Sequence, residues 1–334
     1  MAAFAHEAGV ALRPHAKAHK LPLIARKQLE LGAVGITCSK LGEAEVLVAG
    51  GILGILISSE IVGPTKIARL IALARHARLT IVVDDAENAA AISAAAVDAG
   101  INIAALVEVD VGQRRCGVQP GQPAVDLAGV VARLPGLTFT GLQGYEGHLQ
   151  HVYDRAERKA LCDAAMEKLV ATRAAVEASG LPVGIVTTAG TGTAEFAVLH
   201  EGVTEIQPGS YIWMDCNYAR VAGTPYESAL SVIATVVSRQ RPNDVIVDAG
   251  WKALSTDGGM PVALDCPDLT YSPAGDEHGR LTVADGGTLP ESGDRVAIVP
   301  SHCDTTVNLY DWLIGVRNGV VETIWPIPGR GKTT

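Results

Sequence analysis

Long apolar runs and an excess of basic residues are both missing from this chain. No run approaches the roughly 18 consecutive apolar residues that span a bilayer, and the first residues lack the pattern of a signal peptide. The 27 basic residues are outnumbered by 36 acidic ones, which gives a formal charge of -9. Because nucleic acids and anionic membranes attract basic surfaces, we expect neither as a partner.

Closely spaced cysteines are also absent. The six cysteines are scattered between Cys38 and Cys303, and no two of them form a C-x-x-C pair. Disulfide frameworks and zinc sites need cysteines at short, regular spacings. The pattern therefore indicates reduced thiols, and we expect a cytoplasmic protein.

A G-x-G-x-x-G phosphate fingerprint is missing after the first predicted strand, which disfavours a doubly wound open sheet. Instead, apolar, β-branched runs alternate with helix-like or turn segments. The runs cover residues 11–17, 34–39, 52–59, 79–85, 101–110, 137–145, 183–190 and 205–209. Nearly continuous apolar runs are typical of parallel strands buried on both faces. Eight such alternations predict an α/β fold of the (β/α)8 TIM-type barrel class, with the doubly wound sheet as the alternative.

The pattern changes after about Tyr218. Short apolar strands are then separated by Pro, Gly and Asp turns, and a hairpin is predicted around Asn318-Gly319. We predict a barrel domain over residues 1–230 and a smaller all-β domain over residues 231–334.

The segment from Leu12 to Lys20 carries the most chemical information. It reads as a short strand ending on Lys17, with two imidazoles and further basic side chains nearby. A lysine among cations and low-dielectric walls loses proton affinity, so its amine can act as a nucleophile near neutral pH. Barrel enzymes place their chemistry at the C-terminal ends of strands. The alternative is a solvated basic turn.

Two predicted loops on the same barrel face carry further polar groups. Arg115 follows the fifth strand between two glycines, where a guanidinium could balance an anion or a cofactor ring. Tyr145 and His151 follow the sixth strand, and His151 could serve as a general base because an imidazole exchanges protons near pH 7. A surface turn and a solvated histidine are the respective alternatives.

The loops after the seventh and eighth strands are rich in glycine and hydroxyl groups. Barrel enzymes commonly bind a phosphate at these two loops, through free backbone N–H groups. The residues are Gly190, Thr191, Gly192, Gly209, Ser210 and Tyr211.

One motif of the β domain could bind a metal. On an extended backbone His302 and Asp304 would lie on one side and Cys303 on the other. An imidazole and a carboxylate so placed could hold a divalent cation, and a structural hydrogen bond is the alternative. The polar cluster Asp276-Glu277-His278 has no role that we can derive.

Five motifs in their order resemble those of one family. R-P-H-A-K-A-H-K, G-Y-E-G, A-G-T-G-T, P-G-S-Y and P-S-H-C-D-T-T are similar to the D-threonine aldolase and 3-hydroxy-D-aspartate aldolase family. That family belongs to the alanine racemase-like, fold-type III pyridoxal-phosphate enzymes and is related to the eukaryotic-type D-serine dehydratases. The resemblance runs over essentially the whole chain.

The resemblance implies roles for these residues. Lys17 would form the Schiff base with pyridoxal 5'-phosphate, His151 would be the base, and His302 with Asp304 would bind the metal. Arg115 and Tyr145 would flank the cofactor ring. The residues around the cofactor, mostly near its phosphate, would be Ser39, Thr191, Gly209, Ser210 and Tyr211. In the dehydratase relatives a cysteine stands at the position of Asp304, and an oxygen ligand suits Mn²⁺ or Mg²⁺ better than Zn²⁺.

The activity implied is that of a lyase. A metal-dependent aldolase would cleave a D-β-hydroxy amino acid, such as D-threonine or 3-hydroxy-D-aspartate, to glycine and an aldehyde. A D-serine or 3-hydroxyaspartate dehydratase is the alternative. A non-catalytic cofactor-binding protein is disfavoured, because those proteins lack a β domain. The family also implies a homodimer.

Two departures from the family pattern stand out. Family members begin with another strand and the first part of a helix, so we expect both to be missing ahead of Met1. Ser39 occupies a position where some relatives carry glutamine.

Overall fold

The computed structural model describes residues 1–264, 266–284 and 287–334. They form two units by internal contacts, one of residues 1–209 with 332–334 and one of residues 210–331. The division after Gly209 lies ahead of the compositional change near Tyr218, on which the predicted boundary at residue 230 depends. That boundary stays a prediction. Within the described residues, no helix is long and apolar enough to span a bilayer.

The first unit contains an eight-stranded parallel sheet. Its spatial order is β1-β8-β7-β6-β5-β4-β3-β2. The strands are β1 (Ala11–Leu12), β2 (Ile36–Cys38), β3 (Gly54–Ile57), β4 (Arg78–Val83), β5 (Ile103–Glu108), β6 (Leu137–Gln143), β7 (Ile185–Thr188) and β8 (Glu205–Ile206). Each predicted run thus contains a strand, except that β4 begins at Arg78, one residue ahead of its run.

The first and last strands of this order meet. Val34 N donates to Leu12 O and Thr37 N to Pro14 O, both at 2.9 Å, and His15 forms a parallel bridge with Thr37. The sheet therefore curls until its two ends are connected, which confirms the predicted barrel class.

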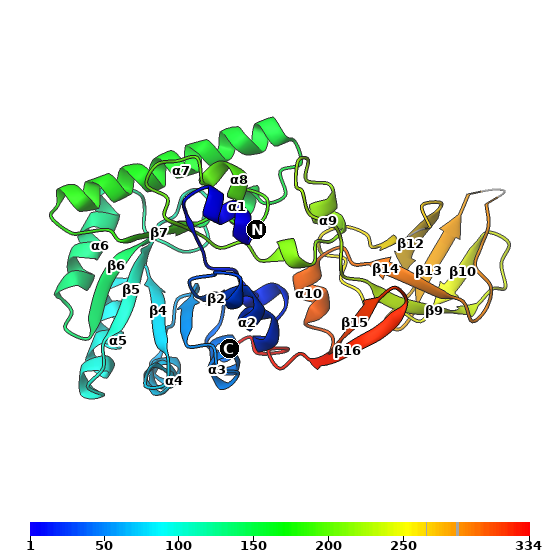
Figure 1. The fold of residues 1–334 in the computed structure, drawn as a ribbon, viewed down its shortest axis with the longest axis horizontal. Coiled ribbons are helices and arrows are strands. Elements are labelled where there is room, and N and C mark those ends of the chain that lie inside the picture. The colour runs from blue at the N-terminus through cyan, green and yellow to red at the C-terminus, as the bar shows by residue number, and fades with distance from the viewer. Residues whose placement is uncertain (265, 285–286) are drawn as a thin grey trace. The chain divides into compact units, whose positions relative to one another are not determined.

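Helices alternate with these strands and lie outside strands β4 to β7 in Figure 1. They are α1 (Ala2–Glu7), α2 (Pro22–Glu30), α3 (Leu41–Ala49), α4 (Pro64–Ala74), α5 (Ala86–Asp98), α6 (Gln122–Arg133), α7 (Arg155–Ala178) and α8 (Ala194–Ala197). α4 begins at Pro64, which needs no N–H partner in the first turn, and α7 is followed by Gly180 with φ 92°.

The strands are buried on both faces, as their apolar runs predict. Ile55, Ile57 and Ile81 belong to the large core shared with the helices. The alternate residues Leu56 and Val82 form a second buried cluster with Leu106. Because successive strand side chains point to opposite faces, this second cluster fills the inside of the curled sheet.

The second unit is mostly antiparallel. Six strands close a barrel in the order β10-β13-β12-β11-β14-β9. They are β9 (Val232–Ser238), β10 (Asp244–Val247), β11 (Val262–Ala263), β12 (Leu269–Pro273), β13 (Gly279–Val283) and β14 (Arg295–Val299). The unit also contains η3 (Ser210–Ile212), α9 (Cys216–Ala219) and α10 (Cys303–Val307).

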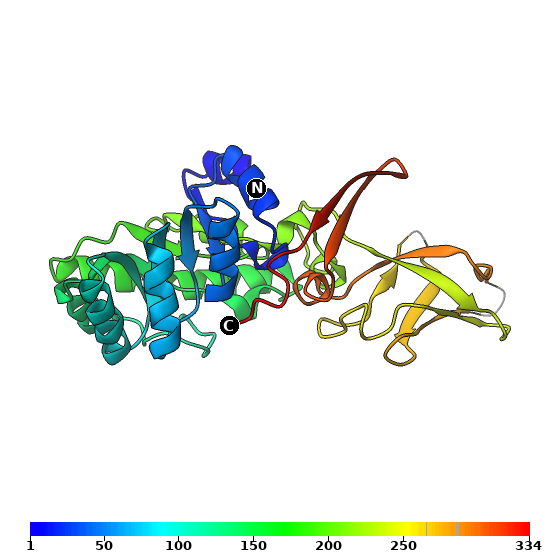
Figure 2. The same cartoon turned by 90° about the horizontal axis from the view of Figure 1, so that it is seen from below.

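A separate hairpin completes the second unit. β15 (Trp312–Arg317) pairs with β16 (Val320–Pro326), and Figure 2 shows it as a projecting red ribbon. Asn318 and Gly319 have φ values of 50° and 77°, the left-handed conformations that the predicted Asn-Gly turn requires.

Candidate active site

Lys17 lies just beyond the first strand. The strand ends at Leu12, earlier than predicted, and Lys17 occupies the middle of a single turn of 3-10 helix, η1 (Ala16–Ala18). Beyond Pro14, which has no N–H to donate, the chain keeps one more sheet contact at His15, which bridges Thr37, and then turns into η1. The side chain of His15 then caps the turn, because its Nδ1 accepts the N–H of Lys17 at 3.3 Å.

Three predicted site residues meet at one aromatic ring. Lys17 Nζ lies 6.0 Å from the centroid of the Tyr145 ring, and the guanidinium carbon of Arg115 lies 5.6 Å from it. These side chains come from loops after β1, β6 and β5. The structure thus brings together an amine, a phenol ring and a guanidinium group from segments far apart in the sequence.

His15 is a buried neighbour of Lys17 that sequence reasoning gave no role. Burial, followed by the positive charges of Lys17 and His19, holds the pKa of its imidazole well below the ordinary value. A neutral ring whose Nδ1 accepts a hydrogen bond carries its proton on Nε2. This Nε2 faces the hydroxyls of Ser58 at 3.3 Å and Ser39 at 3.5 Å.

Ser39 is held at this position by a buried ion pair. Glu43 pairs with Lys20 at 2.5 Å, and its other carboxylate oxygen accepts the backbone N–H of Ser39 at 2.9 Å. Lys20 is itself 9% exposed, with a left-handed φ of 57°. The backbone beside Ser39 is therefore fixed by paired charges in the interior.

The glycine loop after β7 is close-packed against Gln150. The N–H of Gly192 donates to Gln150 Oε1 at 2.9 Å, and that of Gly190 donates to Thr193 Oγ1 at 3.2 Å. A Cβ at Gly192 would lie 2.4 Å from the backbone oxygen of Gln150. The sequence analysis expected free N–H groups in this loop, but these two are bonded to protein acceptors. Position 192 requires glycine because Gln150 approaches its backbone so closely.

Glu146 lies below the same loop and is fully buried. Its carboxylate accepts hydrogen bonds from Thr188 Oγ1 at 2.8 Å, Ala189 N at 3.3 Å and Thr193 Oγ1. Ala189 has a left-handed φ of 64°, which costs energy in a residue with a Cβ. The hydrogen bonds to Glu146 hold Ala189 in this conformation and so fix the start of the loop.

Arg158 connects this loop to the one that carries His151. The side chain, on α7, is fully buried. Its Nε donates to Gly192 O at 2.8 Å, and its Nη1 donates to Val152 O at 2.7 Å. His151 directly precedes Val152, so one guanidinium cross-links the predicted base segment and the glycine loop.

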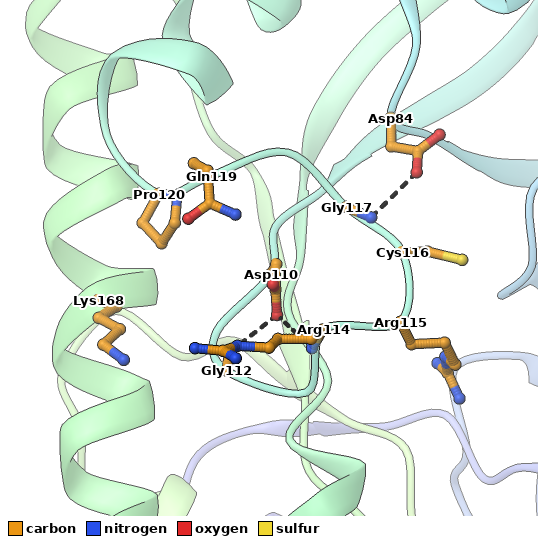
Figure 3. Close-up of a pocket in the computed structure, with 10 residues that line it drawn as sticks. All are labelled: Asp84, Asp110, Gly112, Arg114, Arg115, Cys116, Gly117, Gln119, Pro120 and Lys168. Carbon is orange, nitrogen blue, oxygen red and sulfur yellow. Dashed lines mark hydrogen bonds between the residues drawn. The ribbon is translucent and has the colours of Figure 1, made fainter.

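The loop of Arg115 borders a pocket of about 680 Å³. Asp110 Oδ1 accepts the N–H groups of Gly112 and Arg114 at 2.9 Å, which folds the loop back on itself. Figure 3 shows Arg115 and Cys116 on the opposite side of this loop from Lys168. The pocket residues are Asp84, Asp110, Gly112, Arg114, Arg115, Cys116, Gly117, Gln119, Pro120 and Lys168.

Negative charge gathers beside Arg115. Possible ligand atoms of Glu60, Asp84 and Cys116 lie within 4.8 Å of one another. Burial first, and then Glu60, raise the pKa of the Cys116 thiol to about 11, and the same two causes raise the pKa of buried Glu108 well above its ordinary range. The Arg115 guanidinium acts against both increases, so it is the counter-charge of this cluster.

A row of side-chain amides runs from Glu108 across the barrel. Gln143 Nε2 donates to Glu108 Oε2 at 2.5 Å, and Gln207 Nε2 donates to Gln143 Oε1 at 2.8 Å. The amide of Gln207 also donates to Thr187 Oγ1 at 2.8 Å. All four groups are buried near the C-terminal ends of strands β5 to β8.

The second unit holds the predicted metal pair. His302 is the extended residue before α10, and Asp304 lies in the first turn of that helix, with His302 Nε2 and Asp304 Oδ2 3.9 Å apart. The expectation of an extended backbone through Asp304 was wrong. The two side chains nevertheless converge, because the helix begins between them.

Cys303 lies between the pair and points inward. Burial raises the pKa of its thiol well above the ordinary value, as does the adjacent Asp304 carboxylate. Its backbone N–H donates to the buried carboxylate of Asp215 at 2.8 Å, which also caps α9. Cys303 is therefore a protonated core residue, while Asp215 fixes the backbone between the two candidate ligands.

Ser210 and Tyr211 begin the second unit as part of η3. Ser210 is buried, and the ring of Tyr211 lies 5.8 Å from that of Tyr226. Gly209, at the end of the first unit, lies against His15, whose backbone oxygen is 2.9 Å from where a Cβ would stand. Gly209 therefore packs directly on the segment that precedes Lys17.

Two family descriptions match the chain. "Alanine racemase, N-terminal domain" matches residues 1–217, and "Putative serine dehydratase domain" matches residues 229–316. The sequence is 46% identical to a D-threonine aldolase of Arthrobacter sp and 39% identical to a 3-hydroxy-D-aspartate aldolase of Paracoccus denitrificans (strain Pd 1222). Each alignment covers 99% of this chain and 88% of the relative.

Solved structures agree with these matches. A crystal structure of D-threonine aldolase from Filomicrobium marinum has a TM-score of 0.98 at 46% identity, over 100% of this chain and 91% of that one. A D-threo-3-hydroxyaspartate dehydratase from Delftia sp. HT23 has a TM-score of 0.86 at 30% identity, over 96% of this chain and 91% of that one.

Proposed function

The chain belongs to the family of D-threonine and 3-hydroxy-D-aspartate aldolases, which are alanine racemase-like enzymes of pyridoxal-phosphate fold-type III, and we propose that it cleaves D-β-hydroxy amino acids to glycine and an aldehyde. The observation that carries this proposal is the identity of 39–46% to two such aldolases over 99% of the chain. Both are lyases, and so is this protein.

The residues around Lys17 fit pyridoxal 5'-phosphate. The cofactor is a flat, anionic aldehyde, and the site offers an amine beside an aromatic ring with a guanidinium group near the same ring. We propose that Lys17 bonds the cofactor, that Arg115 and Tyr145 flank its ring, and that Ser39 lies beside it. The loop of Gly190, Thr191 and Gly192, together with Gly209, Ser210 and Tyr211, would hold the phosphate. When bound, the cofactor supplies an electron sink for the cleavage of the Cα–Cβ bond.

The protein's own groups prepare the amine of Lys17. His15 and His19 are buried on either side of it in the sequence, and the charges of Lys20 and Arg115 also act on His15. His15 also caps the turn through the N–H of Lys17, which fixes the backbone from which the nucleophile extends.

His151 is proposed to remove the proton of the substrate's β-hydroxyl. An imidazole is suited to this because its proton exchange is centred near neutral pH. The carbonyl of the next residue, Val152, is bonded to buried Arg158, which restricts the loop that presents the ring. A D-specific reaction would follow if this base acts on only one side of the bound amino acid.

His302 and Asp304 are proposed to hold a divalent ion. An imidazole nitrogen and a carboxylate oxygen 3.9 Å apart can bind one cation and leave its other positions open. The oxygen ligand favours Mn²⁺ or Mg²⁺ over Zn²⁺. Such an ion lowers the pKa of a hydroxyl that binds it.

A product assay tests the proposed function. Purified protein with pyridoxal phosphate and Mn²⁺ would be offered D-threonine, L-threonine and 3-hydroxy-D-aspartate. We expect glycine and an aldehyde from the D-substrates only. Ammonia and a 2-oxo acid without glycine would instead identify a dehydratase.

The dehydratase is the second candidate, because a D-threo-3-hydroxyaspartate dehydratase of Delftia sp. (strain HT23) is 31% identical over 94% of this chain. That identity is lower than the identity to the two aldolases. The same product assay separates the two activities.

We also propose a cytoplasmic homodimer. The β15–β16 hairpin supports a partner copy, since an isolated two-stranded hairpin is only marginally stable in water. It exposes large apolar side chains, among them Trp312, Ile314, Val320 and Ile324. Patches of this kind mark interaction sites. Light scattering after gel filtration would report twice the chain mass for the proposed dimer and a single mass for a monomer.

A further inference from the structure

Asp257 contacts the side of His302 that faces away from Asp304. Asp257 precedes His302 by 45 residues and lies in the segment between β10 and β11. Its Oδ2 lies 2.7 Å from His302 Nδ1, and its Oδ1 accepts the hydroxyl of Thr305 at 3.0 Å. Both oxygens of this carboxylate thus bind groups at the start of α10.

The segment that carries Asp257 is joined to the 301–306 segment by further bonds. Ser301 Oγ donates to Ser255 O at 2.8 Å, and Ser255 Oγ donates to His302 O at 3.1 Å. Thr306 Oγ1 donates to Ser255 Oγ at 3.0 Å. Asp257 therefore reaches His302 from a backbone that is already fixed against the candidate metal pair.

The carboxylate determines what His302 can offer to a metal. A carboxylate accepts, so Nδ1 carries a proton and Nε2 keeps its lone pair. That Nε2 is the atom 3.9 Å from Asp304 Oδ2. We propose that Asp257 is a positioning residue for the metal site, which holds His302 in the tautomer and orientation that present Nε2 to the ion.

This inference depends on the proposed metal role of His302 and Asp304. The alternative is an ordinary surface ion pair, since the side chains of His302 and Asp257 are 27% and 51% exposed. An exposed pair contributes little to stability. Outer partners of metal-bound histidines instead affect metal affinity, typically by roughly 10- to 100-fold. Metal affinity therefore separates the two readings.

The experiment compares Asp257→Asn with Asp268→Asn, which removes the same charge at an exposed position of the same unit. Cofactor-loaded protein would be stripped with a chelator and titrated with Mn²⁺ by calorimetry. We expect the Kd for Mn²⁺ to rise about 10- to 100-fold in Asp257→Asn, and to stay within about twofold of wild type in Asp268→Asn. The melting temperature of the metal-free protein should be the same in both.

Two further variants keep the outcomes apart. Asp257→Glu keeps the carboxylate and should restore part of the Mn²⁺ affinity. His302→Gln should lose Mn²⁺ binding. A Kd for Asp257→Asn within twofold of wild type, with binding lost in His302→Gln, would overturn the positioning role alone. Unchanged binding in His302→Gln would overturn both this inference and the proposed metal site.

Discussion

The glycine loop of the first unit and the candidate metal pair of the second are held in place differently. Around the glycine loop the supporting side chains Glu146, Gln150 and Arg158 are at most 2% exposed. Beside the metal pair the supporting carboxylate of Asp257 is about half exposed. In both regions side-chain hydrogen bonds hold a candidate functional segment, but only in the first are these bonds shielded from water.

Because of this difference in burial, we expect the loss of a hydrogen bond to have different effects in the two regions. A buried polar group that loses its hydrogen-bond partner stays desolvated, which destabilises the folded state. The stability of the fold therefore depends on the bonds around the glycine loop. An exposed partner regains water instead, so the bonds around the metal pair affect ligand binding far more than stability. The predictions that follow test this separation, beginning with the largest effect.

Lys17→Ala should remove the chemistry without removing the fold. Lys17 is only half-buried, so we expect little change in unfolding, loss of the visible absorbance of bound cofactor, and at least about a 10³-fold loss of activity. Absorbance spectra and turnover measure this, with Lys27→Ala on the exposed side of α2 as control. Wild-type absorbance in Lys17→Ala would refute the assignment.

Arg158→Met should show that the support of the glycine loop is structural. It leaves the buried carbonyl of Gly192 and the carbonyl of half-buried Val152 without their donor, so we expect a loss of about 3 kcal/mol in the free energy of unfolding. Urea denaturation measures this. Arg155→Met is the matched control on the same helix, because Arg155 is exposed and its ion pair with Glu195 should contribute little. Equal effects of the two substitutions would contradict the comparison.

His15 should give the first unit a pH-dependent stability. Its pKa is lowered in the folded state. At a pH below the unfolded pKa of about 6.5, His15 therefore binds a proton in the unfolded chain but stays neutral in the folded one. Stability should therefore fall with decreasing pH, by up to about 1.4 kcal/mol per pH unit. Urea denaturation between pH 7.5 and 5 should show a shallower slope in His15→Asn than in wild type or in His76→Asn, an exposed control. Identical slopes would rule out this contribution.

Thr305→Val should give the smallest effect. It removes the hydroxyl that orients Asp257 but leaves the bond from Asp257 to His302. We expect the Kd for Mn²⁺ to rise about two- to fivefold, as the loss of one hydrogen bond would cause. An effect as large as that of Asp257→Asn would mean that Thr305, rather than the carboxylate, sets the geometry.

The barrel was predictable because its signal is local and repeated. Each strand run, the Pro64 helix start and the Asn318-Gly319 turn depend on neighbouring residues only. Local patterns failed where the backbone departs from regular structure, at the short strand before Lys17 and at the helix that begins at Cys303.

The predicted site residues could be named from motifs, but their supports could not. Glu146 stands inside the G-Y-E-G motif and Gln150 directly precedes His151, yet their bonds reach Thr193 and Gly192, more than 40 residues away. Asp257 is 45 residues from His302 and belongs to no recognisable pattern. Contacts of this kind arise only when the chain folds, and no spacing rule encodes them.

The row of amides from Glu108 to Gln207 has a direction. Each amide has one donating and one accepting end, so Gln143 can give its hydrogen to Glu108 only while its oxygen faces Gln207. A protonated Glu108 would still keep an accepting oxygen, so Gln143 can hold this orientation whether or not the carboxyl group carries a proton. The bonds to Glu108 and Gln207 therefore fix which end of the Gln143 amide faces each neighbour, and this part of the barrel interior has one defined orientation of its amides.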